Sequence, residues 1–189
     1  MANETPATPS PAAPASSAGT PMAPAPAPAA PAPAPRPAAP ATAVPPPEPK
    51  PNPLPHVDLP FQGVDYALRG FHAEVTVAPA DVVSAAQKLD REGFALDTIT
   101  GVDWIAVGQM EVVYDFFHFH KNLRVVVRTR IPRETPELPS IHQVFPGANW
   151  HERETHDFFG IQFLGHPDLT PFLLPEDADY HPLRKDFVA

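Results

Sequence analysis

The chain has 189 residues, a formal net charge of −9, 30 prolines and no cysteine. The lack of cysteine excludes disulfides, thiolate zinc sites, iron–sulfur ligation and cysteine nucleophiles. The acidic balance disfavours nucleic-acid binding through phosphate contacts. No stretch approaches the roughly 18 apolar residues of a membrane span, and the N-terminal sequence lacks the pattern of a signal peptide, so we expect a soluble intracellular chain.

Residues 1–53 are dominated by Ala-Pro repeats, and twenty of the prolines precede His56. Such a composition lacks the apolar bulk that offsets ordering entropy, and it favours extended polyproline segments. We therefore predict a disordered Pro/Ala-rich tail over residues 1–53 and one folded domain over residues 54–189. The tail is expected to act as a tether, and the alternative is a proline-rich ligand for an aromatic groove.

The first predicted elements of the domain are a strand and a helix. Residues 71–77 alternate apolar and polar side chains, which is the period of a half-buried strand. Residues 80–92 carry apolar residues on one helical face, with Asp81 at the start and Gly93 where a C-terminal cap is expected. A further strand is predicted at residues 94–100.

A β-hairpin is predicted from residues 110–119 and 123–131, which are rich in strand-forming residues and flank a polar turn. The order strand, helix, strand, strand, strand predicts an α+β fold with a mainly antiparallel sheet and helices on one face. The hairpin also carries a basic cluster, which is either a solvated strand face or a site for an acidic protein partner. This cluster comprises Arg124, Arg128, Arg130 and Arg133.

Two helices are predicted after the hairpin. Ser140 is expected to cap a short helix that ends at Phe145, before a Pro-Gly pair. Asn149, followed three residues later by Glu152, has the spacing of a capping box for a helix over residues 150–159.

The chain becomes irregular beyond that helix. Gly160 is expected to end the helix, and residues 161–163 to form a short strand. Residues 166–189 are punctuated by prolines and rich in charged and aromatic residues. Because long irregular segments of compact proteins are usually functional or bound to a partner, we divide the domain into a core (70–165) and a C-terminal docking arm (166–189).

The helix over residues 150–159 carries His151 and His156, which suggests comparison with zinc-protease helices. Those helices need two histidines four residues apart, whereas five residues rotate by about 500°, so the two rings diverge by about 140°. A metal site is therefore disfavoured. Glu152 with His156, and Arg153 with Asp157, have the spacing of helical ion pairs; alternatively, part of this charged set lies at the edge of the core, where a carboxylate must be paired.

No catalytic, cofactor-binding or metal-binding residue is predicted. The serines of the domain, Ser84 and Ser140, have the positions of a helix-face residue and a helix cap. A glycine-rich phosphate loop is also missing from the sequence. A stand-alone hydrolase that uses the histidine-bearing helix remains the rival hypothesis, and it predicts a stoichiometric metal in the isolated chain.

Several ordered blocks of the sequence closely resemble a known family, the thirty-kilodalton subunit of proton-pumping NADH:quinone oxidoreductase (respiratory complex I). The resemblance covers about residues 70–187. The blocks are residues 100–104, 145–150, 150–161, 165–169, 173–177 and 181–187. In one departure, Thr170 and Pro171 stand where the family tends to carry a basic pair.

The resemblance implies a peripheral, non-catalytic subunit of a translocase that carries electrons from NADH to quinone. It implies packing against the quinone-site (forty-nine-kilodalton) protein and neighbouring iron–sulfur subunits on the cytoplasmic side of the inner membrane, with membrane contact only through the complex. NADH, FMN, iron–sulfur clusters and quinone would belong to the assembled complex and not to this chain. The alternative is the equivalent subunit of an energy-converting hydrogenase or a formate hydrogenlyase.

The resemblance also focuses attention on the polar residues of the last helix and the arm as contacts with partner subunits. The predicted interface residues are Glu152, Arg153, Glu154, Asp157, His166, Asp168, His181, Arg184, Lys185 and Asp186. We expect these residues to support assembly and not to carry out chemistry.

Overall fold

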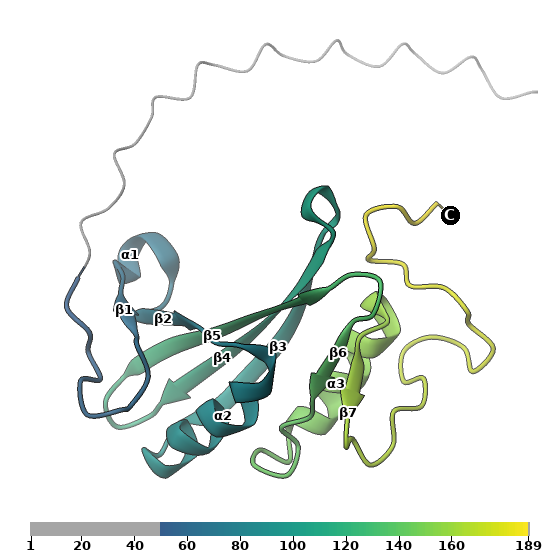
Figure 1. Cartoon of the computed structure of the whole chain (residues 1–189). Coiled ribbons are helices and arrows are strands. Elements are labelled where there is room, and N and C mark those ends of the chain that lie inside the picture. The colour runs from purple at the N-terminus through teal and green to yellow at the C-terminus, as the bar shows by residue number, and fades with distance from the viewer. Residues whose placement is uncertain (1–49, 189) are drawn as a thin grey trace, which may run out of the picture. The chain divides into compact units, whose positions relative to one another are not determined.

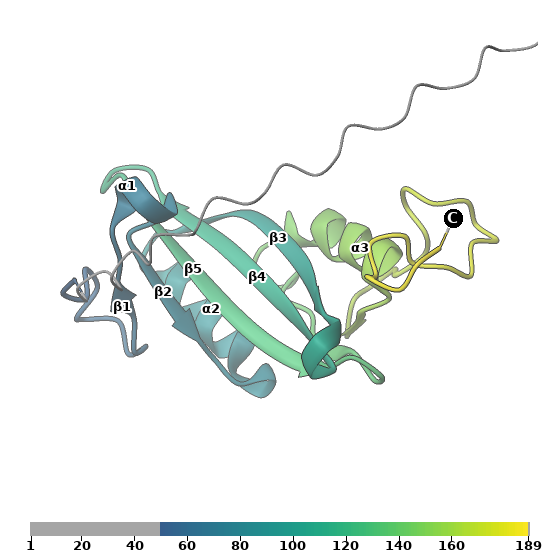
Figure 2. The same cartoon turned by 90° about the horizontal axis from the view of Figure 1, so that it is seen from above.

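The computed structural model describes residues 50–188, so residues 1–49 of the predicted tail lie outside the described part of the chain. The described residues form a five-stranded sheet and a separate two-stranded sheet (Figures 1 and 2). None of their helices is long and apolar enough to cross a membrane. The elements are β1 (Gln62–Gly63), α1 (Tyr66–Arg69), β2 (Ala73–Thr76), α2 (Val82–Arg91), β3 (Ala95–Trp104), β4 (Gln109–His118), β5 (Leu123–Pro132), β6 (Glu137–Pro139), α3 (Ala148–Phe159) and β7 (Gln162–Leu164).

The larger sheet has the strand order β1-β2-β5-β4-β3. The predicted hairpin is confirmed: β4 and β5 pair antiparallel, with Tyr114 opposite Val127, and β3 pairs antiparallel with β4. Strand β2 pairs parallel with β5, with Ala73 opposite Val125. The α+β, mainly antiparallel prediction is therefore confirmed, and one parallel pair lies at the centre of the sheet.

The main core lies between the sheet and helices α2 and α3, which are on the same side of the sheet in Figure 1. Val112, Tyr114 and Phe116 alternate along β4 and are fully enclosed. Helix α2 places its apolar face on this layer through Val82, Ala85, Ala86 and Leu89. The opposite face of the sheet carries a smaller cluster around Phe71 and Val126.

The core extends further towards the N-terminus than the predicted boundary at residue 70. Leu54, Val57 and Phe61 are buried members of the main core. Lys50 forms a β-bridge with Gly63 of β1. The segment before the first strand is thus packed against the sheet domain.

The predicted helix between Ser140 and Phe145 is wrong. This segment forms a turn in which the N–H of Phe145 bonds to the carbonyl of Ile141. The predicted capping box is also wrong, because α3 begins at Ala148 and has no side-chain capping bond. Glu152 instead accepts a hydrogen bond from Ser140. The two residues that were predicted to cap separate helices therefore bond to each other.

The pairing of β6 with β7 was not predicted. Residues 137–139 follow Pro136 and end in Pro139, and prolines are unfavourable in the interior of a strand. In the structure, Leu138 lies opposite Phe163 in a short parallel pair. This pair holds the two ends of the segment that contains α3 and thereby fixes where the C-terminal arm begins.

Candidate functional site

The C-terminal arm (residues 166–188) contains turns but neither helix nor strand. It is the yellow segment beside α3 in Figures 1 and 2. Because it lacks a secondary-structure ladder, its backbone polar groups need other partners. Three groups of polar contacts, from α3, from the end of α3 and from the sheet, provide many of these partners.

The first group centres on Asp157, a buried residue of α3 that is 3% exposed. Its Oδ2 atom accepts hydrogen bonds from three successive backbone N–H groups, those of Phe172 (2.9 Å), Leu173 (2.6 Å) and Leu174 (3.2 Å). Hydrogen bonds to an ionised acceptor are stronger than neutral ones. One carboxylate therefore determines the path of the middle of the arm.

Arg153, one turn earlier on α3, holds the preceding residues of the arm. Its Nε atom donates to the carbonyl of Thr170 (3.1 Å) and its Nη2 atom to the carbonyl of Pro171 (3.1 Å). The guanidinium carbon lies 5.4 Å from the ring centroid of Trp150 and 5.1 Å from that of Phe172. Both rings are thus within the range of cation–π attraction.

The second group is at the C-terminal end of α3, where the last carbonyls of a helix lack intrahelical partners. The arm supplies partners for three of them. His181 Nδ1 contacts the carbonyl of Asp157 (2.8 Å), and the N–H of Leu183 donates to the carbonyl of Phe158 (3.2 Å). Arg184 Nε donates to the carbonyl of Phe159 (2.7 Å). A guanidinium at this position also complements the negative end of the helix dipole. The arm therefore caps the helix that it follows.

Gly160, predicted to end α3, is confirmed as its C-terminal cap, with φ of 73°. A Cβ atom at this position would also collide with the side chains of His181 and Arg184. The residue is glycine for two reasons, because the backbone is left-handed and because the arm crosses directly over it.

The third group fastens the end of the arm to β3. Asp103 accepts from the N–H of Lys185 (2.8 Å) and from Arg133 Nε (2.9 Å), and Arg133 also donates to Asp186 (2.5 Å). Burial acts to raise the pKa of Asp103, but the hydrogen bonds from Arg133 and from the N–H of Lys185 outweigh it, so this pKa lies below its usual value. Asp103 is thus an ionised acceptor that links the sheet to the arm.

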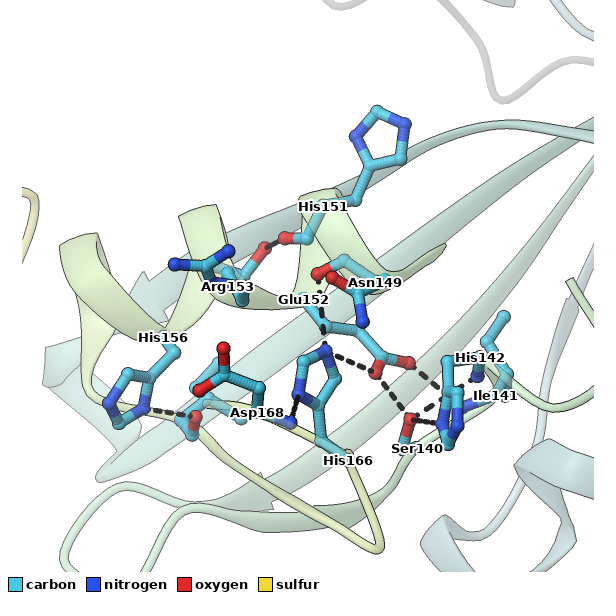
Figure 3. A network of polar contacts seen from close by, with 12 residues as sticks. Ser140, Ile141, His142, Asn149, His151, Glu152, Arg153, His156, His166 and Asp168 are labelled. Carbon is cyan, nitrogen blue, oxygen red and sulfur yellow. Dashed lines mark hydrogen bonds and ion pairs between the residues drawn. The ribbon is translucent and has the colours of Figure 1, made fainter. Parts of the chain in front are cut away.

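A buried polar cluster lies where the arm begins (Figure 3). Glu152 has no exposed surface; its Oε2 atom lies 2.5 Å from Ser140 Oγ and its Oε1 atom accepts from the N–H of Ile141 (2.8 Å). His166 Nε2 is 3.9 Å from Oε2. Burial raises the pKa of Glu152 to about 7, since the bonds from Ser140 and Ile141 only partly offset the lost solvation.

The ring of His166 is also enclosed in this cluster. Its Nδ1 atom accepts from the N–H of Asp168 (3.1 Å), and its Nε2 atom faces the carbonyl of Asn149 (3.2 Å). Burial lowers the pKa of His166; the contact with Asn149 opposes this shift and the neighbouring His142 adds to it. These contacts fit a neutral ring with its proton on Nε2.

The predicted interface residues fall into three classes of exposure. Glu154, Asp168, Lys185 and Asp186 are exposed, Arg153, His166, His181 and Arg184 are half-buried, and Glu152 and Asp157 are buried. The expected pairs of Glu152 with His156 and of Arg153 with Asp157 are wrong, because these side chains bond to other segments. Of the alternative, a paired carboxylate at the edge of the core, the burial is confirmed by Glu152, but no lysine or arginine of residues 50–188 pairs with it. Contact with a partner remains a prediction for the whole set.

The basic cluster of the hairpin is engaged within the chain. Its ion pairs are Arg124 with Asp97, Arg128 with Glu74 and Glu111, Arg130 with Glu111, and Arg133 with Asp103 and Asp186. These contacts already neutralise much of its charge. The sequence alone did not reveal these pairs because the partners lie on other strands of the sheet or on the arm.

The exposed apolar residues of the same region were not predicted from the sequence. Large hydrophobic side chains that are 38–54% exposed gather on α3 and the arm, namely Trp150, Phe172, Leu173, Tyr180, Leu183 and Phe187. The sequence did contain a signal for them. Apolar residues in a segment without a helical or strand period cannot form a buried face by themselves, so some of them are expected to be exposed. The arm is therefore polar towards its own domain and partly apolar towards the outside.

The two histidines of α3 are not brought together. Figure 3 shows the rings of His151 and His156 pointing in different directions, and His156 Nδ1 contacts the carbonyl of Ile161 (3.0 Å). Among residues 50–188, no group of three or more histidine or carboxylate side chains is arranged to hold a metal ion. The geometry gives no support to the hydrolase hypothesis.

The family described as "Respiratory-chain NADH dehydrogenase, 30 Kd subunit" matches residues 75–189, which include β3 to β5, α3 and the whole arm. The chain belongs to this family. The predicted resemblance is thereby confirmed. The match covers the segments that make the three groups of contacts, so the arm and its attachment lie within the family region.

Relatives of this 30 kDa family member are named as the C subunit of NADH-quinone oxidoreductase. That of Roseiflexus castenholzii is 40% identical over 117 residues, covering 59% of this chain and 67% of the relative. That of a Jannaschia species is 48% identical over 118 residues, covering 60% and 56%. The chain thus spans between half and about two thirds of these relatives.

Among solved structures, the membrane-bound sulfane sulfur reductase, an archaeal respiratory membrane complex, contains a similar chain. The TM-score is 0.57 at 29% sequence identity, and the match covers 61% of this chain and 71% of that one. The fold of the 30 kDa family member is therefore shared with a chain of a second kind of respiratory complex.

Proposed function

We propose that this chain is a peripheral, non-catalytic subunit of a proton-translocating NADH:quinone oxidoreductase, and that it supports electron transfer from NADH to quinone by docking the quinone-site protein. Family membership and the names of the relatives support the complex. The arm supports the docking role.

The observation that carries this proposal is the two-sided arm. Its inward polar groups are bonded to Asp157, Arg153 and Asp103, while its apolar side chains remain exposed. A prearranged apolar surface binds a partner at a smaller entropic cost than a flexible segment. Exposed aromatic and aliphatic side chains are also the usual centre of a protein–protein interface.

The polar residues of the region divide into two roles under this proposal. The exposed Glu154, Asp168, Lys185 and Asp186 are available for contacts at the rim of the interface. Glu152 and Asp157 are enclosed, so they act by holding α3 and the arm in place. Mutation of the two buried residues should therefore affect the shape of the surface, and mutation of the exposed ones its charge.

We assign the cofactors of the reaction to other subunits. NADH, FMN, the iron–sulfur clusters and quinone would be bound by neighbours, among them the quinone-site and iron–sulfur proteins of the peripheral arm of the complex. This chain would then lie on the cytoplasmic side of the membrane and contact the membrane only through them. This chain would contribute to the reaction by holding the subunits that bind these cofactors in their relative positions.

A second candidate is the equivalent subunit of another respiratory complex, such as an energy-converting hydrogenase or a formate hydrogenlyase. The likeness to a chain of the archaeal sulfane sulfur reductase complex favours this candidate. The two candidates share the docking role and differ in the electron donor. The identity of the co-purifying subunits distinguishes them.

The test is affinity isolation of the tagged full-length protein from gently solubilised membranes, followed by mass spectrometry. We expect a flavin-bearing NADH-oxidising module and the quinone-site protein; nickel-hydrogenase subunits would indicate the second candidate. Leu183→Asp should reduce recovery at least tenfold, since a charge would be buried at the interface. Leu68→Asp is the matched control, because Leu68 is exposed on α1, away from the arm.

The control should recover the complex like the unmodified protein. Equal recovery with Leu183→Asp would contradict the proposed docking surface. A protein that is isolated alone with a stoichiometric metal would overturn the docking role and restore the hydrolase hypothesis.

A further inference from the structure

Glu152 is a buried carboxyl group without a cationic partner. It has no exposed surface, and no lysine or arginine of residues 50–188 forms an ion pair with it. An isolated carboxylate is very unfavourable inside a protein, so such a group normally keeps its proton. Whether Glu152 keeps its proton depends on the charges of the groups that surround it.

Titratable groups face Glu152 from three elements. These are Tyr114 on β4, His142 in the turn after β6, and His166 at the start of the arm, with Arg153 and Asp168 next to His166. Tyr114 is 1% exposed, and its hydroxyl has no hydrogen-bond partner within the described residues. Burial, together with the charge of Glu152, raises the pKa of Tyr114 well above its usual value, so this group is neutral.

His166, the nearest basic side chain, does not supply a positive charge. Its Nδ1 atom accepts the N–H of Asp168, which requires a free lone pair on that nitrogen. A second proton on the ring would break this hydrogen bond at the first turn of the arm. The ring is thus a neutral cover over Glu152.

A hydrogen-bonded route joins Glu152 to the turn after β6. Ser140 Oγ lies 2.5 Å from Glu152 Oε2 and 3.0 Å from His142 Nδ1 (Figure 3). Loss of the proton to solvent leaves the carboxylate accepting hydrogen bonds from Ser140 Oγ and from the N–H of Ile141. The half-buried position of His142 brings this route towards solvent.

We propose that Glu152 is a proton-binding site at the root of the C-terminal arm, occupied in the closed structure, and that loss of its proton opens the root of the arm. The ionised carboxylate has no cation to pair with, and it gains hydration when His166 moves away. That movement breaks the contacts of His166 with Asn149 and Asp168. The ligand of this site is a single proton, and its effect is on the ordering of the arm.

The pKa of Glu152 near 7 places this event in the neutral range. Because its closed-state pKa lies above the value of an open, solvated glutamate, opening becomes more favourable as the pH rises from about 4.5 to about 7, and levels off above that. For these values the opening equilibrium changes about tenfold between about pH 6 and about pH 8. Burial lowers the pKa of His166, so its ring stays neutral at the upper end of this range.

The test is hydrogen exchange of the full-length protein at about pH 6 and about pH 8, corrected for intrinsic exchange. The protection of the Asp168 and Thr170 amides should fall about tenfold over this interval. Glu152→Gln, which resembles the protonated form, should remove this dependence and keep high protection at both values. Glu154→Gln, an exposed change on the same helix, should retain it.

A second measurement does not depend on how well the glutamine variant folds. The carboxyl carbon of Glu152, followed by NMR in the unmodified chain, should titrate near pH 7, whereas titration near the ordinary value of 4.5 would overturn the proposal. Persistence of the pH dependence in Glu152→Gln would also overturn it. Both measurements concern the chain alone, so their failure would leave the docking proposal standing.

Discussion

Replacing Asp157 with asparagine removes the charge that holds the middle of the arm and preserves the size of the side chain. The carboxylate accepts three backbone N–H groups, at distances of 2.6–3.2 Å. A hydrogen bond to a charged acceptor is worth about 1 kcal/mol more than a neutral one, so three bonds lose about 3 kcal/mol. The amide oxygen of asparagine can still accept these bonds, but as a neutral acceptor.

Hydrogen exchange measures this loss at the affected amides. About 3 kcal/mol corresponds to an increase of roughly two orders of magnitude in the opening of the arm, read at the amides of Phe172, Leu173 and Leu174. Core amides, such as that of Tyr114, should keep their protection, because the arm covers little of the main core. Glu154→Gln is the matched control, since it neutralises an exposed carboxylate on the same helix.

Two results would refute this reasoning. Protection of the three amides within about threefold of the unmodified protein would show that the carboxylate contributes little, in contrast to the expectation for charged hydrogen bonds. An equal loss of protection at Tyr114 would show that the substitution unfolds the whole domain. In that case Asp157 would be a core residue and not a specific support of the arm.

Three further predictions concern stability. Gly101→Ala places a Cβ atom 2.5 Å from Phe159 Cδ2 and should lower the free energy of unfolding, measured in urea, by about 1–3 kcal/mol. Gly147→Ala is the control: its Cβ would have no atom within 4 Å, so the free energy of unfolding should change by less than about 0.5 kcal/mol. Gly160→Ala, at φ of 73°, should cost at least about 1 kcal/mol and expose the arm to protease. Between about pH 4.5 and pH 7, the free energy of unfolding should fall by roughly 3 kcal/mol because the pKa of Glu152 is higher in the folded than in the unfolded protein. The Glu152→Gln variant should lack this fall. Parallel curves of unfolding free energy against pH for the two proteins would disprove the prediction.

The features that were predicted correctly are those that depend on neighbours in sequence. The hairpin of β4 and β5 followed from two strand-forming runs around a short polar turn, and helix α2 from its apolar face and from Gly93. Gly160 was recognised as a helix end for the same reason. Family membership also followed from the order of short motifs, each of which lies within a few residues.

The pairings that were missed join distant segments. Strand β2 pairs with β5 in parallel, and β6 pairs with β7 across the whole of α3. A parallel pair requires a crossover, and its partner is chosen by the packing of the intervening helix. The short strand at residues 137–139 has no strand-like sequence pattern, so it can be recognised only from its pairing with β7 in the structure.

The sequence by itself determined the strand and helix periods, the polar character of the arm and the charged residues at its base. Only the tertiary structure decided which of those charges are enclosed: Glu152 bonds to Ser140 and not to Asn149, and Asp157 bonds to the arm and not to Arg153. The physical reason is that a buried carboxyl group takes the donors that folding brings within about 3 Å of it, and in this chain those donors come from other segments and not from its own helix.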